Sequence, residues 1–380
     1  MKKIFLKILF INIFVFLHIC TFAQSRIQIS LLTCAPGEEL NETFGHSALR
    51  VIDSNSLTDH VYNYGIFNFE DNYFYIKFIK GKLKYFVNID QYQDFVFYYQ
   101  QANRGVTEQI LNFTELEKQQ IYTALIENVR EENKYYQYDF FLDNCTTRVR
   151  DIIEKYKKPK LLLPPVMPTN YTFRNAIHQY LDKSNKVWSK LGIDILLGAK
   201  TDAVMTVEEQ SFLPENLMYA LDSSSNTSIV QSAKQIFVVN KIENKKSFFT
   251  PIFLSSFILL VFVLLSFLKN NISKKLLKIF DFLLFFLTGA LGILLMFMWV
   301  GTDHSMTKNN YNLLWASPLF AVFAFLLNKK NNQFKTISKF TFLYLLLVLG
   351  SWFFLPQLMN IGLLPIVVLL AWRSWVHKFF

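Results

Sequence analysis

The C-terminal part of this 380-residue chain is far more apolar than the rest, and this feature constrains the fold most. Beyond Lys245 five apolar segments follow one another, near residues 249–268, 279–300, 313–327, 338–355 and 361–376. Most approach the roughly 20 residues that a helix needs to cross a bilayer. The third and fifth are shorter, which is typical of tilted or partly re-entrant segments. We therefore expect residues 246–380 to form an all-α bundle of about five transmembrane helices.

The composition agrees with a membrane portion and argues against nucleic acid as a partner. The chain is 52% hydrophobic and 17% aromatic, which is unlike an ordinary soluble domain. Its formal net charge is +10, but the lysines gather beside the apolar segments instead of forming a basic and aromatic RNA-binding motif. We expect the membrane itself, and no nucleic acid, to be the partner of these charges.

The lysines between the apolar segments predict the orientation. Cytoplasmic loops are enriched in Lys and Arg. Two loops carry such clusters, consisting of Lys269, Lys274, Lys275 and Lys278 in the first and Lys329, Lys330, Lys335 and Lys339 in the second. With these loops inside, the N-terminal domain faces the periplasm. The predicted location is the inner, cytoplasmic membrane, crossed several times.

The N-terminus has the pattern of an export signal. Lys2, Lys3 and Lys7 precede or flank an apolar stretch over residues 4–19, and small residues follow near Ala23. This order is typical of a secretory signal peptide, and an uncleaved N-terminal anchor is the alternative. Either segment, residues 1–23, would export the mixed region at 24–245.

Residues 24–245 predict an α+β domain with an antiparallel sheet. Segments of alternating or β-rich pattern lie at residues 27–32, 46–52, 61–67, 84–89 and 106–113. Gly65 interrupts the third and indicates a bulge or a close backbone approach. A capping box at Thr114–Glu117 opens a helix that runs to about residue 131. Further helices are expected at 171–181, at 188–197 and after Pro214.

Cys145 is the residue whose position most favours chemistry. Asp143 and Asn144 are typical of turns and helix caps. After them Val149, Ile152 and their successors recur at helical spacing, so Cys145 falls at a helix N-terminus. Unpaired backbone N–H groups there stabilise a thiolate and lower a cysteine pKa. We predict Cys145 to be a nucleophile.

His46 is the best candidate for the base that a thiol nucleophile needs. It opens a predicted strand directly after Phe44 and Gly45. Cys34 is a rival nucleophile, but no helix follows it to stabilise a thiolate. In an oxidising envelope the alternative is a structural disulfide between Cys34 and Cys145, which would remove both thiols from catalysis.

Several residues are candidates for supporting the predicted pair, and the sequence does not decide among them. Asn63, Asp143 or Glu39 would orient the imidazole, and Asn144 or the backbone N–H groups at the helix start would stabilise an oxyanion. Arg148 and Arg104 are candidates for binding a phosphate. We expect no metal and no cofactor.

A densely polar loop at residues 301–312 separates two of the apolar segments on the predicted periplasmic side. It contains His304 and several asparagines. The loop is either a solvated connection or one wall of the site at the level of the lipid headgroups.

Several motifs together resemble a known family. They are Thr33–Gly37, Phe44–Ala48, Tyr62–Gly65, Asp143–Arg148 and Asn310–Trp315. With the five-segment tail, they resemble the Lnb family of lipoprotein N-acyltransferases of Bacteroides and its relatives. The order of histidine first and cysteine second, at a helix start, is also similar to permuted NlpC/P60 and lecithin:retinol-acyltransferase-like enzymes.

The resemblance implies a permuted papain-like periplasmic domain followed by membrane spans. It implies that Cys145, assisted by His46, takes an acyl chain from a phospholipid as a thioester. The acceptor would be the α-amine of a diacylglyceryl-cysteine lipoprotein. Two alternatives remain: a periplasmic thiol hydrolase of lipid or cell-wall substrates, and a non-enzymatic membrane adaptor.

Overall fold

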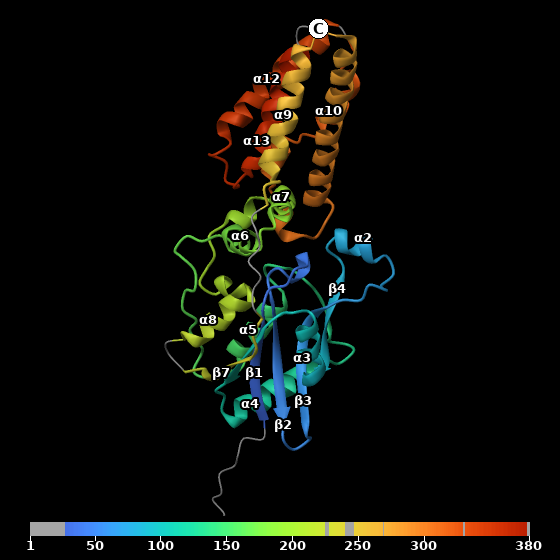
Figure 1. Ribbon diagram of the computed structural model, residues 1–380. Coiled ribbons are helices and arrows are strands. Elements are labelled where there is room, and N and C mark those ends of the chain that lie inside the picture. The colour runs from blue at the N-terminus through green and yellow to red at the C-terminus, as the bar shows by residue number, and fades with distance from the viewer. Residues whose placement is uncertain (1–26, 225–227, 240–246, 269, 330, 378–380) are drawn as a thin grey trace, which may run out of the picture.

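The structure is a computed structural model that describes residues 27–224, 228–239, 247–268, 270–329 and 331–377. The predicted signal segment 1–23 lies outside these residues. A domain built on a β-sheet is followed by a helical region that stands on one end of it (Figure 1). The α+β class of the first domain and the helical nature of the second are confirmed.

The sheet has seven strands in the order β6-β4-β3-β2-β1-β5-β7, and every neighbouring pair is antiparallel. The strands are β1 Ile27–Cys34, β2 His46–Asp53, β3 Thr58–Ile66, β4 Lys84–Gln91, β5 Val106–Leu111, β6 Tyr135–Gln137 and β7 Val230–Phe237. All five predicted strands are present. The sequence did not predict β6 and β7, which lie at the two edges. The register between β3 and β4 shifts between Asn63 and Ile66, so the irregularity predicted at Gly65 is confirmed.

Seven α-helices accompany the sheet in the described part of this domain. They are α2 Phe74–Ile79, α3 Tyr92–Gln101, α4 Glu115–Asn128, α5 Cys145–Tyr156, α6 Phe173–Lys183, α7 Val187–Leu196 and α8 Pro214–Asp222. The predicted capping box of α4 is confirmed, because Thr114 and Glu117 exchange side-chain-to-backbone hydrogen bonds. The sequence did not predict α2 and α3, whose aromatic residues favour strands as much as helices.

The two faces of the sheet have separate cores. On one face Leu31, Leu49 and Tyr62 pack with Ile121 of α4 and Ile153 of α5. The other face places Leu32, Ala48 and Val61 against α3. Burying one such side chain stabilises the fold by about 1.5–3 kcal/mol. These contacts hold α5 against one face of the sheet. The first residue of α5 lies at the end of the sheet where β2 begins.

The helical region contains α9 Pro251–Phe267, α10 Asn271–Val300, α11 Leu319–Leu326, α12 Asn332–Ser351 and α13 Leu364–His377. Among the described helices, α10 and α12 are long and apolar enough to cross a membrane, and α9 and the segment ending in α13 are shorter apolar helices. The predicted third segment is only an eight-residue helix preceded by a 3-10 turn. The expectation that it is too short for a simple crossing therefore agrees with the structure.

Polar groups join the helical region to α7. Asn310 Nδ2 donates to the carbonyl oxygen of Ile195 at 2.8 Å, and Asn312 Nδ2 donates to that of Asp194 at 2.9 Å. Asn360 Nδ2 donates to the Asp194 carboxylate at 2.8 Å. The polar loop thus lies against the sheet domain, while the lysine-rich turns lie at the far end of the bundle (Figure 1). This arrangement agrees with the orientation expected from the charges.

Candidate active site

Cys145 is the first residue of α5, as predicted, and Asn144 is its N-cap. The Asn144 side-chain oxygen accepts hydrogen bonds from the backbone N–H groups of Thr146 and Thr147, at 2.7 and 2.9 Å. The Thr147 hydroxyl accepts from the Asn144 N–H at 2.8 Å, which completes a capping box. The thiol is therefore held at the positive end of a well-capped helix.

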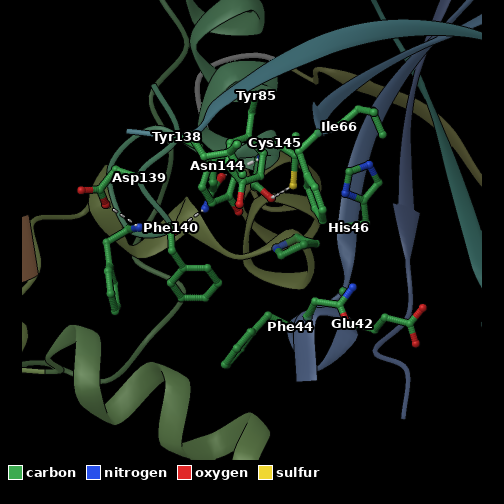
Figure 2. Close-up of a pocket in the computed structure, with 18 of the residues that line it drawn as sticks. Glu42, Phe44, His46, Ile66, Tyr85, Tyr138, Asp139, Phe140, Asn144 and Cys145 are labelled. Carbon is green, nitrogen blue, oxygen red and sulfur yellow. Dashed lines mark hydrogen bonds between the residues drawn. The ribbon is translucent and has the colours of Figure 1, made fainter. Parts of the chain in front are cut away.

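His46 is the first residue of β2, and its approach depends on Gly45. Gly45 has φ +81°, and a Cβ added there would lie 2.7 Å from the carbonyl oxygen of Cys34. Only glycine adopts this turn without strain. The turn brings the His46 ring next to Cys145 (Figure 2).

Asn63 is the hydrogen-bond partner that orients the imidazole. His46 Nε2 donates to Asn63 Oδ1 at 2.6 Å, and the ring also forms a hydrogen bond with Cys145. Asn63 Nδ2 donates in turn to Asp90 at 2.9 Å, and Asn88 donates to the other oxygen of Asp90 at 2.7 Å. The structure thus holds a chain of contacts from Asp90 through Asn63 and His46 to Cys145.

The pair is arranged to ionise. Burial is the largest influence on the pKa of Cys145 and opposes ionisation. The charge and hydrogen bond of His46, the Ser47 backbone N–H and the Thr146 hydroxyl outweigh it, and the pKa falls from 9.0 to about 7. For His46, burial lowers the pKa but the interaction with Cys145 and the bond to Asn63 raise it overall. Both shifts favour a thiolate–imidazolium pair.

Cys34 has the opposite environment. It is fully buried, and burial raises the pKa of its thiol from 9.0 to about 12. Both Cys34 and Cys145 are free thiols in the structure, so the disulfide considered from the sequence is absent between these two described residues. Cys34 has the properties of a core residue.

Asn144 is not available as the oxyanion donor that the sequence suggested. Both hydrogens of its amide are used, because Nδ2 donates to the carbonyl oxygens of Phe140 at 2.7 Å and Phe212 at 3.0 Å. Of the backbone N–H groups at the helix start, which were the other predicted donors, those of Thr146 and Thr147 already donate to the Asn144 side chain. As the first helical residue, Cys145 has an N–H that the helix itself does not use.

The structure does not place Asp143, Arg148 or Glu39 where their predicted roles would need them. Arg148 Nε and Nη2 donate to the two oxygens of Asp143 at 2.6 and 2.7 Å. The Arg148 guanidinium also lies 3.6 Å above the ring of Tyr136, so it is already paired. Glu39 is exposed, and its carbonyl oxygen accepts from Lys186. The sequence allowed three orienting residues for His46, and of these Asn63 forms a hydrogen bond with its ring.

A cavity of about 1360 Å³ opens beside Cys145 and His46. Aromatic side chains, among them Phe44, Tyr138 and Phe140, line it near the thiol (Figure 2). At its other end it reaches Met298, close to the end of α10. It exceeds the roughly 300–1,000 Å³ that is typical of small-molecule pockets. The cavity is mainly apolar, and its lining includes both Cys145 and a residue near the end of α10.

Arg104 and His304 both line this cavity, but each is already partly engaged. The buried Arg104 donates through Nε to the Ala35 carbonyl oxygen at 2.9 Å and pairs with Glu42 at 3.2 Å. His304 forms part of the wall, as the second interpretation of the polar loop expected. The asparagines of that loop hold it on α7 instead.

Sequence analysis missed several residues of the site. Asp90 fixes Asn63, and the Ser47 N–H and Thr146 hydroxyl contact the thiol. The only sequence signal for Asp90 was its alternation with Asn88 at the end of the strand predicted over residues 84–89. Within the described residues, no group of three or more His, Cys, Asp or Glu side chains could hold a metal ion.

Comparison with known proteins gives two matches to family models. The model of the Lnb N-terminal periplasmic domain matches residues 19–179, and the model of the Lnb transmembrane domain matches residues 243–380. Together they cover most of the chain. No curated protein and no solved structure matches it. The chain is therefore a membrane protein with a periplasmic domain.

Proposed function

The chain belongs to the Lnb family, and from this premise we propose that it is a lipoprotein N-acyltransferase of the inner membrane. The acyl donor is a phospholipid. The acceptor is the α-amine of a diacylglyceryl-cysteine lipoprotein. Cys145 and His46 carry the reaction and Asn63 positions the imidazole. Residues 24–245 form the catalytic domain and residues 246–380 the membrane domain.

The first half-reaction forms a thioester. The Cys145 thiolate attacks the carbonyl carbon of an acyl ester, and the Cys145 N–H stabilises the resulting oxyanion. The ester C–O bond then breaks, and the imidazolium of His46 gives its proton to the departing alcohol oxygen. A lysophospholipid leaves and the acyl chain stays on sulfur.

The second half-reaction forms the amide. The lipoprotein amine attacks the thioester carbonyl, and the neutral imidazole of His46 takes the proton that the amine loses. The C–S bond breaks and the thiolate–imidazolium pair is restored. The same ring therefore acts as acid in the first half and as base in the second.

The cavity is the observation that carries this proposal. It connects a thiol with a lowered pKa to the periplasmic end of α10, and its lining near Cys145 is aromatic. Both substrates are held in a membrane by their acyl chains. A cell-wall hydrolase acting on a polar polymer would have no use for an apolar path to a membrane helix.

A substitution at the thiol tests the proposal. Cys145→Ala should abolish the N-linked acyl chain at lipoprotein N-termini, measured by mass spectrometry, and Cys34→Ala is the matched control that should retain it. With wild-type protein, incubation with phospholipid alone should leave an acyl adduct on the Cys145 peptide. An unchanged N-linked chain in the Cys145→Ala strain would refute the mechanism. Free fatty acid as the main product with a lipopeptide acceptor present would indicate a hydrolase.

A further inference from the structure

The connection between β3 and β4 exposes an unusual number of large apolar side chains. We call this set the α2 edge; it consists of Phe69, Tyr73, Tyr75, Ile76, Phe78 and Ile79, which are 71%, 76%, 75%, 53%, 50% and 48% exposed. No residue of α2 itself is buried. Contiguous apolar surface of this kind is rare on soluble domains and marks a contact site.

Hydrogen bonds fix the α2 edge to the loop that follows α10. His304 Nε2 lies 3.1 Å from the carbonyl oxygens of both Phe78 and Ile79. The Asp303 N–H donates to the Lys80 carbonyl oxygen at 2.9 Å. Figure 1 shows α2 beside this loop, at the end of the sheet domain that faces the helical bundle. The α2 edge is therefore held beside the loop that directly follows the apolar helix α10.

Charge on the same segment fits a lipid surface. Lys80, Lys82 and Lys84 directly follow α2 and are exposed. Lysines beside exposed aromatic and aliphatic side chains are the pattern of elements that lie in the interface of anionic membranes.

We propose that the α2 edge is an interfacial membrane element. Its aromatic and aliphatic side chains enter the periplasmic leaflet, and the lysines bind lipid phosphates. Phe69 and Phe78 also line the cavity, so the segment separates the cavity from the bilayer. An acyl chain that reaches Cys145 passes beside α2. This last step rests on the proposed function, whereas the membrane contact does not.

Spin labels measure the membrane contact without any activity. The full chain carrying Cys20→Ser and Cys145→Ala is placed in nanodiscs of phosphatidylethanolamine and phosphatidylglycerol, and nitroxides are attached at Tyr75→Cys or Ile76→Cys. The control is Leu57→Cys in the β2–β3 turn, an equally apolar residue that is 90% exposed at the far end of the hairpin. We expect the nitroxides at positions 75 and 76 to be more accessible to oxygen than to a polar nickel reagent. The nitroxide at position 57 should show the reverse order of accessibility. Solvent-like values at all three positions, or coupling between labels of two copies, would overturn the proposal.

An activity ratio tests the route into the cavity. Tyr75→Asp with Ile76→Asp should lower the acyl-transfer rate from vesicle phospholipid about tenfold relative to the rate from a short-chain donor in detergent. Leu57→Asp should leave this ratio unchanged. An unchanged ratio in the α2 variant would refute the route. Absence of transfer from either donor in the wild-type protein would refute the proposed function and leave the spin-label result standing.

Discussion

At the scale of single residues, the site depends on a thiol that ionises although it is buried. Desolvation alone would make Cys145 resemble Cys34, whose pKa rises to about 12. The difference lies in the partners, because Cys145 has an imidazole, a backbone N–H and a hydroxyl around its sulfur. The pKa difference between these two buried thiols is therefore set by the groups around each sulfur and not by exposure.

The first prediction concerns the pH dependence of that thiol. Below pH 7 Cys145 is mostly a thiol and above it mostly a thiolate, so alkylation by a small iodoacetamide should increase through a midpoint of about 7. In His46→Ala the attraction is lost while burial still opposes ionisation, so the midpoint should move upward from about 7. Peptide mass spectrometry over a pH series gives both midpoints. Equal midpoints in the two proteins would show that the pair does not form.

The sequence predicted part of this site and left part open. Cys145 at a helix start and His46 at a strand start follow from local pattern, which is why the pair was predictable. The choice among Asn63, Asp143 and Glu39 depends on which strand lies beside β2, and no local pattern contains that information. Asn144 was assigned both a cap and an oxyanion role, and only the contacts of its amide hydrogens decide between them.

At the scale of elements, α5 begins with Cys145, the proposed nucleophile, and the cap of the helix fixes its first turn. Asn144 binds two N–H groups of the helix and two carbonyl oxygens of neighbouring loops. Loss of a cap alone costs about 0.5–2 kcal/mol. A buried carbonyl that loses its donor adds roughly 1–3 kcal/mol.

The second prediction compares two capping boxes. Asn144→Ala should lower the melting temperature and also slow alkylation of Cys145, because the helix start moves away from His46. Thr114→Ala removes the equivalent cap of α4, away from the site, and should lower the melting temperature without changing the alkylation rate. The melting curve and the alkylation rate are measured on the same preparations. Slower alkylation in both variants would indicate a general loosening of the domain.

The elements that the sequence missed share a physical cause. No side chain of β7 is buried, and its partner β5 lies more than 100 residues away in the sequence, so neither pattern nor proximity identifies it. β6 has only three residues. α2 has six residues, of which all but Lys77 are apolar or aromatic, so no alternation of apolar and polar positions reveals a helix. The strands that the sequence predicted contain buried residues, and α4 and α5, which it also predicted, have complete capping boxes.

At the scale of the whole molecule, the two regions are joined by polar groups in a mostly apolar setting. Asn312 donates to the Asp194 and Ile195 carbonyl oxygens and accepts from the indole of Trp315 at 2.8 Å. At Gly198 an added Cβ would lie 2.0 Å from the Lys308 carbonyl oxygen, so the backbones are in direct contact. The joint holds the polar loop as a wall of the cavity.

The third prediction tests this joint. Asn312→Ala leaves buried carbonyl oxygens and an indole N–H without their partner, so it should lower the melting temperature and reduce acyl transfer from vesicle phospholipid. The pH midpoint of Cys145 alkylation should stay near 7, because His46, Asn63 and α5 belong to the sheet domain. Asn331→Ala, which removes the cap of α12 at the opposite end of the bundle, is the control and should keep transfer. A shifted midpoint in Asn312→Ala would mean that the site itself depends on the joint.

Among the described residues that line the cavity, Cys145 is the only one with a thiol. Under the proposed function, a phospholipid and a lipoprotein cannot both lie next to the Cys145 sulfur at the same time. The two half-reactions are therefore separate in time, and the interval between them can have any length. Whenever new lipoproteins are scarce, the enzyme would wait in its acylated form. The envelope would then hold a standing reserve of loaded enzyme, and the delay before a newly exported lipoprotein is finished would be independent of the supply of donor lipid.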